Sequence, residues 1–252
     1  MNRNETFPAI LVNTLSARLA WASLDVVVED VEQIQLFISG AENDVKDLRV
    51  TCVENRLAVE QPNCGINFKK LGAEHWLQIM IRLPRSWKGA VDLSTISAPL
   101  TVHGLSGTDF TLDTITGDLA AGGLTTMTCA LRTVSGNVKA EDIFGEKLSL
   151  RTVSGDITAR GCSFDTYRIN TVSGQADLDM SRPFDKLECV SVSGDVRLFT
   201  PVTCADAALR SVSGRLLTRN ISIQHGAPEA RMSSVSGNFE INCSTAATYE
   251  EE

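Results

Sequence analysis

The sequence has no long hydrophobic run. No apolar segment approaches the roughly 20 residues that a transmembrane helix needs, so we expect no membrane span. The apolar stretch at residues 7–12 is ended by Asn13 and Thr14, which makes it shorter than the hydrophobic part of a signal peptide. We therefore predict no signal peptide, and cytoplasmic residence is the default expectation.

Positive charge is also scarce. The net charge is −8, the pI is about 5.0, and the longest basic run is the pair Lys69-Lys70. Nucleic-acid binding depends on Lys and Arg that neutralise phosphates. The composition therefore disfavours nucleic acid as a partner, and it disfavours anionic membrane surfaces for the same reason.

Aromatic residues are few, and the cysteines do not pair up. With 9 Phe, 3 Trp and 2 Tyr, the core must be mainly aliphatic. The seven cysteines are an odd number, and neither a CxxC motif nor a zinc-type Cys-His spacing occurs. We interpret them as free, buried thiols of a protein in a reducing compartment.

Catalytic motifs are missing as well. The sequence has no P-loop, GxGxxG, HExxH or GxSxG, and its three histidines, His75, His103 and His225, are isolated from one another. We therefore predict no catalytic residue, no cofactor site and no metal site.

What the sequence does have is an internal repeat. Thr-Val-Ser-Gly or a close variant recurs with glycine spacings of 19, 19, 19, 20, 20 and 23 residues, after a degenerate copy at residues 95–98. The repeated glycines are predicted to be structural corner residues. They are Gly117, Gly136, Gly155, Gly174, Gly194, Gly214 and Gly237.

Aligning the copies on this glycine reveals four apolar columns, at seven and five residues before it and at two and four residues after it. Steps of two are the strand period, so each copy has two short strands that meet at the corner and a looser third side. One copy cannot bury its apolar columns alone, so the copies must stack about 4.8 Å apart. The repeat predicts an all-β, single-stranded parallel β-helix, or β-solenoid, of about eight rungs of 19–20 residues. We expect right-handed winding from the general handedness of parallel crossovers.

The corner glycine has two explanations, which the sequence leaves open. It adopts a backbone conformation closed to other residues, or it makes room for the next rung. The column directly after it also has two interpretations. Asp118, Asp156 and Asp195 could hold a cation through their oxygens, or Asp and Asn could follow turn glycines for local hydrogen bonding. The second interpretation is favoured, because the carboxylates alternate with neutral residues.

A second polar column lies four residues before the glycine and contains Arg132 and Arg151. These arginines could receive an anionic group. Ion pairs with neighbouring carboxylates on a solvated face are the favoured alternative, and such exposed pairs contribute little stability.

The chain divides into three predicted parts. Residues 1–88 are strand-rich without the strict repeat, and we expect an irregular β-rich cap there that covers the open end of the solenoid. The turn at residues 54–56 suggests a hairpin. Residues 89–243 form the solenoid, and residues 244–252 form an acidic tail. The final spacing of 23 and this tail resemble a stop signal, so we predict a monomer or a small homo-oligomer.

The corner Thr-Val-Ser-Gly-Asp-Ile/Val at a 19-residue period resembles the bacterial putative-adhesin family, a group of unknown function, and so does the lead-in strand at residues 79–84. The resemblance covers roughly residues 15–243. It implies a β-helix with an irregular β-rich N-terminal part, and it supplies no catalytic residues.

Three functions remain open. The first is a non-enzymatic interaction, scaffold or adhesin-like module that binds a protein or glycan on a flat solenoid face. The second is a carbohydrate-active β-helix enzyme, a polysaccharide lyase or hydrolase, which needs two carboxylates at a fixed separation or a metal. The third is end-to-end self-assembly. The first is favoured, because Asp142, Asp165, Asp177, Asp179 and Asp185 occupy different offsets in the repeat.

Overall fold

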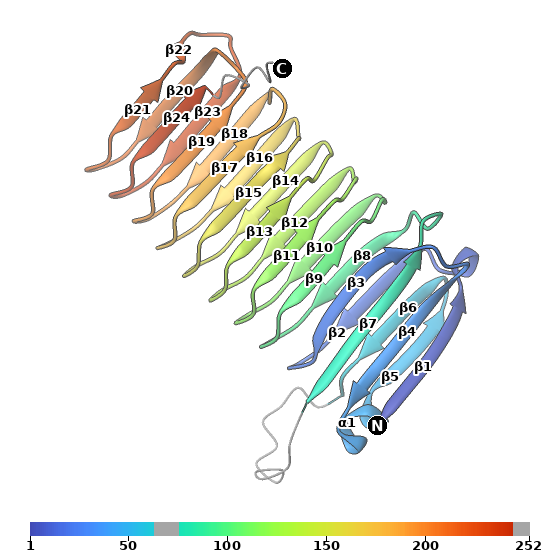
Figure 1. Cartoon of the computed structure of the whole chain (residues 1–252). Helices are drawn as coiled ribbons and strands as arrows, with labels where there is room; N and C mark the ends of the chain where they lie inside the picture. Colours follow the sequence, from blue (N-terminus) through green and yellow to red (C-terminus); the bar gives the residue numbers. More distant parts are fainter. Residues whose placement is uncertain (63–75, 244–252) are drawn as a thin grey trace, which may run out of the picture.

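The computed structural model describes residues 1–62 and 76–243. In this part of the chain, two long β-sheets lie face to face and enclose one apolar core (Figure 1). The helical elements among these residues are the short α-helix α1 (Glu42–Asp47) and the 3-10 turn η1 (Ala9–Leu11).

Each sheet has twelve strands. Sheet A runs in spatial order β1 (Asn2–Pro8), β4 (Gln33–Gly40), β7 (Leu77–Pro84), β3 (Ser23–Glu29), β9 (Leu100–His103), β11 (Leu119–Gly122), β13 (Val138–Glu141), β15 (Ile157–Cys162), β17 (Ala176–Met180), β19 (Val196–Thr200), β24 (Phe239–Cys243) and β21 (Leu216–Arg219). Sheet B runs β22 (Ser222–Ile223), β20 (Cys204–Arg210), β23 (Glu229–Ser233), β18 (Lys186–Val190), β16 (Thr166–Asn170), β14 (Lys147–Arg151), β12 (Thr128–Arg132), β10 (Asp109–Asp113), β8 (Ala90–Ser94), β2 (Thr14–Arg18), β6 (Arg56–Glu60) and β5 (Arg49–Val53).

The repeat produces the central part of both sheets. Each corner leads from a strand of sheet B into a strand of sheet A, and the next copy pairs with it in parallel, one repeat apart, as Leu131 pairs with Leu150. The loop that returns to sheet B forms a narrow third side, where single bridges join Ser106, Thr125, Phe144 and Ser163. The predicted all-β, parallel, solenoid-like architecture is confirmed.

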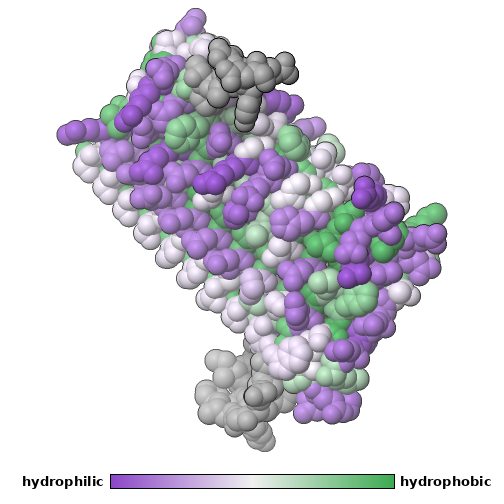
Figure 2. Space-filling view, in the orientation of Figure 1, coloured by the Kyte–Doolittle hydropathy of each residue, from purple (hydrophilic) through white to green (hydrophobic). Residues whose placement is uncertain are grey.

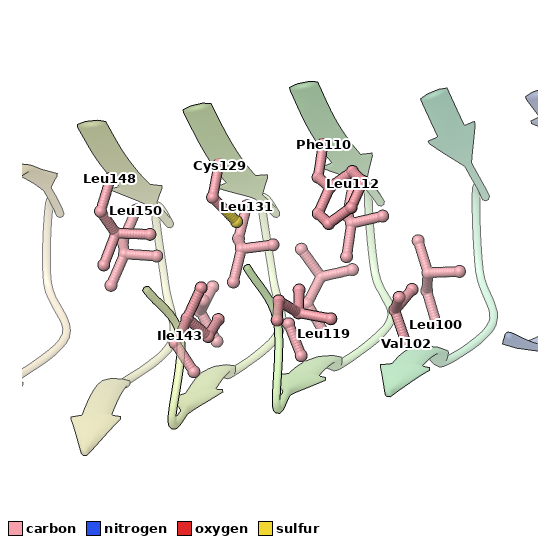
Figure 3. Close-up of a cluster of buried hydrophobic side chains, with 14 of the residues drawn as sticks. Leu100, Val102, Phe110, Leu112, Leu119, Cys129, Leu131, Ile143, Leu148 and Leu150 are labelled. Carbon is pink, nitrogen blue, oxygen red and sulfur yellow. The ribbon is translucent and has the colours of Figure 1, made fainter. Parts of the chain in front are cut away.

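The four apolar columns face the interior, as predicted. Figure 3 shows aliphatic side chains and Phe110 reaching into this core from the strands of both sheets. All members of the columns are buried except Leu209, Leu216 and Thr218. These three residues belong to β20 and β21, which shows that this rung is the one at the end of the stack.

The order of the rungs at the C-terminal end differs from the order in the sequence. Strand β23 lies between β18 and β20, and β24 lies between β19 and β21, so the last repeat is inserted beneath the one that precedes it (Figure 1). The last repeat is therefore not the end of the stack, and its 23-residue spacing is no stop signal. The longer spacing accommodates β22, which pairs with the start of β20 before the chain returns inward.

The N-terminal end has the same inversion. In sheet B, β2 lies between β6 and β8 and pairs in parallel with both. In sheet A, β3 lies between β7 and β9 and pairs in parallel with both. Residues 1–88, expected to form an irregular cap, therefore contribute four strands in parallel pairing, β2, β3, β6 and β7, as well as cap strands. The cap strands are antiparallel: β1 and β4 extend sheet A, and β5 extends sheet B.

The predicted hairpin joins β5 to β6. Its turn residues Glu54 and Asn55 have φ values of 50° and 63°, the positive pair that the tightest hairpin turns require. The antiparallel cap thus finishes the N-terminal end of the stack with strands that cannot continue the repeat.

Candidate binding surface

The corner glycines are sites of close backbone approach. A Cβ atom on Gly155 would lie 1.9 Å from the carbonyl oxygen of Gly136 on the neighbouring rung, and the other six predicted glycines show the same contact at 1.7–2.1 Å. None of the seven has a positive φ. The need for space against the next corner therefore explains the glycine.

The hydroxyl three residues before each glycine forms a hydrogen bond with the backbone of its own corner or of the corner on the neighbouring rung. The Thr152 hydroxyl donates to the Gly136 carbonyl at 3.1 Å, and the Ser191 hydroxyl accepts from the Gly194 N–H at 2.8 Å. These side chains satisfy backbone groups that the tight turn leaves without strand partners.

The Asp/Asn column forms a ladder of hydrogen bonds along the corners. The Asp118 carboxylate accepts from the N–H of Asn137 at 2.8 Å, and the Asn137 side chain accepts from the N–H of Asp156 at 3.0 Å. The Asp156 carboxylate accepts from the N–H of Gln175 at 2.9 Å. The ladder resumes from Asp195 through Asn238 to Arg215, in the inverted rung order. Local hydrogen bonding thus accounts for this column.

The other predicted site residues do not converge. The described residues contain no group of three or more His, Cys, Asp or Glu side chains that could hold a metal ion. His103 is exposed, the ring Nδ1 of His225 lies 3.3 Å from the Asp206 carboxylate, and His75 lies outside the described residues.

The acidic residues considered for glycan cleavage are spread over the surface. Asp177 and Asp179 lie on strand β17 of sheet A, and Asp165 and Asp185 directly precede strands β16 and β18 of sheet B. Asp177 pairs with Arg197 and Asp165 with Arg182, at 3.5 and 3.4 Å. These interactions place the two carboxylates in separate surface ion pairs.

The six described cysteines are free thiols. Four are buried, Cys204 is half-buried, Cys52 is exposed, and Cys64 lies outside the described residues. Burial raises the pKa of Cys129 to about 12 and the pKa of Cys162 to about 11, so both thiols are protonated and unreactive at neutral pH.

A shallow groove of about 540 Å³ crosses the outer face of sheet B, where strands β10 to β18 lie side by side. Its floor is made of the small outward residues Thr111, Ala130 and Ser149 on three adjacent strands. Arg132 stands at the corner side of the floor, and Lys147 stands at the opposite side. This volume falls within the range of about 300–1,000 Å³ that ligand sites occupy.

Cations outnumber carboxylates in this groove. The charged residues that line it are Arg132, Lys147, Arg168, Lys186 and Glu188. Arg168 and Lys186 share the single carboxylate of Glu188, at 3.0 and 2.7 Å. Their hydrogen bonds lower the pKa of Glu188 and hold it ionised. Even with this carboxylate ionised, the four cations and one anion of the lining give it a net charge of +3.

The remaining cations have weak partners or none. Arg132 lies 3.6 Å from Asp113, whose pKa is raised by burial, and no ion pair within the described residues involves Lys147 or Arg151. Arg132 and Arg151 are also direct register partners on β12 and β14, which places like charges side by side. The expectation that both arginines are paired with carboxylates is therefore wrong for Arg151.

Sequence reasoning found Arg132 and Arg151 but missed Lys147, Arg168 and Lys186. Those residues lie in the outward columns six and eight residues before the glycine, which alternate with the buried columns at seven and five. Strand alternation would have placed them on one face, but these columns also contain Thr, Ala, Ser, Asp and Glu, and this mixture hides the site. Hydrophilic side chains are spread over the visible central part of the molecule (Figure 2).

The chain is similar to known proteins along nearly its whole length. The model of the family described as Toastrack DUF4097 matches residues 16–244. A putative adhesin from Bacteroides fragilis has a solved structure with a TM-score of 0.61 and 15% identity, covering 96% of this chain and 97% of that chain. A putative adhesin from Parabacteroides merdae has a TM-score of 0.60 and 10% identity, with 97% and 95% covered.

A third solved structure is described as a putative lipid binding protein from Parabacteroides distasonis, with a TM-score of 0.59, 17% identity, and 97% of this chain and 96% of that chain covered. At these identities the likeness shows the fold alone. No curated protein matches the sequence. No helix in the described part of the chain has the length and apolarity that crossing a membrane would require.

Proposed function

Because the chain belongs to the Toastrack DUF4097 family and carries an electrostatically unbalanced groove, we propose that it is a non-enzymatic binding module that uses the outer face of sheet B. The observation that carries this proposal is the surplus of cations in the groove. The likeness to proteins described as adhesins supports a binding role through the shared fold.

The proposal includes the finer features expected from the repeat. The solenoid is right-handed, with rungs of 19–20 residues, and it acts in the cytoplasm as a monomer or a small homo-oligomer. Its partner is a protein rather than a glycan, because no aromatic side chain lines the groove to pack against a sugar ring.

Affinity capture from the expressing cells tests the binding role with two matched variants. The groove variant carries Lys147→Glu and Arg168→Glu on sheet B. The control variant carries Lys139→Glu and Arg160→Glu, which change the charge by the same amount on the exposed face of sheet A. We expect a partner that is captured by the wild type and by the control variant but lost with the groove variant.

Two results would contradict the proposal. One is a set of captured proteins that is identical for all three forms. The other is turnover in a glycan-cleavage screen that is abolished by an Asp→Asn change, which would make the protein an enzyme.

A further inference from the structure

The charge in the groove of sheet B cannot be balanced by the residues that line it. Four cations and one carboxylate line the groove; from outside it, Asp113 lies 3.6 Å from Arg132 and Glu229 lies 3.9 Å from Lys186. Lys147 has no ion pair among the described residues, and Arg151 adds a further cation next to Arg132 in the β12–β14 register. Like charges directly opposite on neighbouring strands are destabilising. An anionic ligand would remove this repulsion, so the groove favours ligands that carry negative charge.

The groove is also narrow. One side of the groove is formed by the residues that start the strands, and the other by the residues that end them. On β14 these are Lys147 and Arg151, which are four residues apart, so the two sides are separated by about 13 Å at the usual rise of a strand. Next to the row of Lys147 and Lys186, strands β14, β16 and β18 are each preceded by an exposed acidic residue, namely Glu146, Asp165 and Asp185.

This acidic border limits the width of the ligand. A bilayer surface or a broad polyanion would bring its negative charge against the border, and the net charge of −8 for the whole chain would oppose both. A single narrow chain avoids the border. The shape therefore favours one extended segment that runs along the stack, across the strands from β10 to β18.

The lining shows how such a segment would be held. Hydroxyls from Thr111 and Ser149 offer hydrogen bonds, and no large apolar side chain faces out of the groove as an anchor. Successive side chains of an extended peptide point to opposite sides. Carboxylates on one side would therefore meet Arg132, and those on the other side would meet Lys147 and Lys186.

We propose that this groove binds an extended acidic peptide segment of a partner protein, with its carboxylates paired to Arg132 on one wall and to Lys147 and Lys186 on the other. This inference rests on the proposed function, because it names the ligand class for the same face of sheet B. Clusters of cations are a recurring way to recognise acidic motifs.

A labelled octaglutamate peptide tests the inference by fluorescence anisotropy with the full-length protein, and an octaglutamine peptide serves as the neutral probe. We expect saturable binding of octaglutamate only. The Kd should rise at least tenfold in the groove variant and less than twofold in the control variant. Because the contacts are exposed and ionic, the wild-type Kd should also rise severalfold between 50 and 300 mM salt, a range over which the screening length falls by about 2.4-fold. Thermal melts of both variants verify that they are folded.

Three outcomes would overturn the inference: no binding of octaglutamate, equal binding of the neutral probe, or equal losses in the two variants. Groove-dependent binding of polygalacturonate or of phosphatidylserine vesicles, without binding of octaglutamate, would also overturn it. If octaglutamate fails while affinity capture still depends on the groove, the binding role stands and only the acidic-peptide assignment is lost. If capture is also independent of the groove, both proposals fail.

Discussion

The outer faces of the two sheets are built from the same repeats, yet they arrange charge differently. On sheet A, Asp177, Arg197 and Glu240 are successive register partners, so opposite charges alternate along the stack. Arg197 lies 3.5 Å from Asp177 and 4.0 Å from Glu240. On sheet B, Arg132 and Arg151 are register partners with the same sign. Charge therefore alternates in this column of sheet A, whereas this column of sheet B places two like charges side by side.

The difference shows what a repeat protein can vary. Corner and core positions are constrained by contacts with the next rung, and those contacts are the same on every rung. Outward positions are constrained only by their neighbours along the column. The same scaffold can therefore present differently charged faces without any change in its interior.

The strongest way to disrupt both faces is to change the corner that they share. Gly155→Val places a side chain where the Gly136 carbonyl lies 1.9 Å from the Cβ position, and the backbone must move to relieve the overlap. We expect a loss of more than about 3 kcal/mol in the free energy of unfolding, or failure to fold. Urea denaturation measures this change. The adjacent exposed residue provides the control, since Ser154→Val should alter stability by less than about 0.5 kcal/mol. An unchanged urea midpoint for Gly155→Val would refute the packing explanation.

The ladder of hydrogen bonds between the faces has one missing step, at Gln175. Its amide is one methylene further from the backbone than that of Asn, and no hydrogen bond joins it to the N–H of Asp195 in the described structure. Gln175→Asn should restore this step and stabilise the protein by about 0.5–1.5 kcal/mol. Asn137→Gln, the reverse change at an intact step, should destabilise it by a similar amount. Thermal melts of the two variants that shift in the same direction would contradict the ladder.

The two faces should respond with opposite sign to the same substitution. Arg151→Glu places a carboxylate beside Arg132, so stability should rise by about 0.2–1 kcal/mol. Arg197→Glu places a carboxylate between Asp177 and Glu240, so stability should fall by a similar amount. Both shifts should shrink in high salt. Urea titrations at low and high salt measure them, and shifts of equal sign would remove the distinction between the faces.

Buried cysteines between the two sheets should be alkylated much more slowly than the exposed cysteine on the edge strand β5. At pH 8, iodoacetamide should label Cys52 in the native protein, because it is exposed on the edge strand β5. Cys129 and Cys162 should be labelled only as the protein unfolds, because burial raises the pKa of each thiol well above 8. Peptide mass spectrometry over time measures the rates. Labelling of Cys129 as fast as that of Cys52 would show that the core opens without global unfolding.

Much of the fold could be predicted from the sequence, because burial repeats with the glycine. Columns such as the one from Leu112 to Leu150 are apolar in every copy, and their two-residue steps define both strands. The inverted order of the end rungs could not be predicted, because each copy offers its neighbours the same apolar columns. Leu216 and Thr218 differ too little from their equivalents to identify the outer rung.

The site was predicted only in part, for a related reason. Arg132 and Arg151 share one column, and their common charge is visible in the aligned repeat. Lys147, Arg168 and Lys186 come from two different columns, and they become one surface only when parallel strands set those columns side by side. A groove also requires small residues at its floor. Ala130 cannot be recognised as a floor residue from the sequence until its neighbours in the sheet are known.

The inverted rungs have a consequence for how the chain is made. Strands β20 and β21 leave the ribosome before β23 and β24, which are their only long partners among the described strands. The outer rung therefore stays unpaired until then, or it pairs first with β18 and β19. In the second case β23 and β24 must displace it once residue 243 has been synthesised. Such a late rearrangement of long-range pairs is a slow step in folding. A chain cut at residue 228 would lose an inner layer of the stack and leave its outermost layer without support.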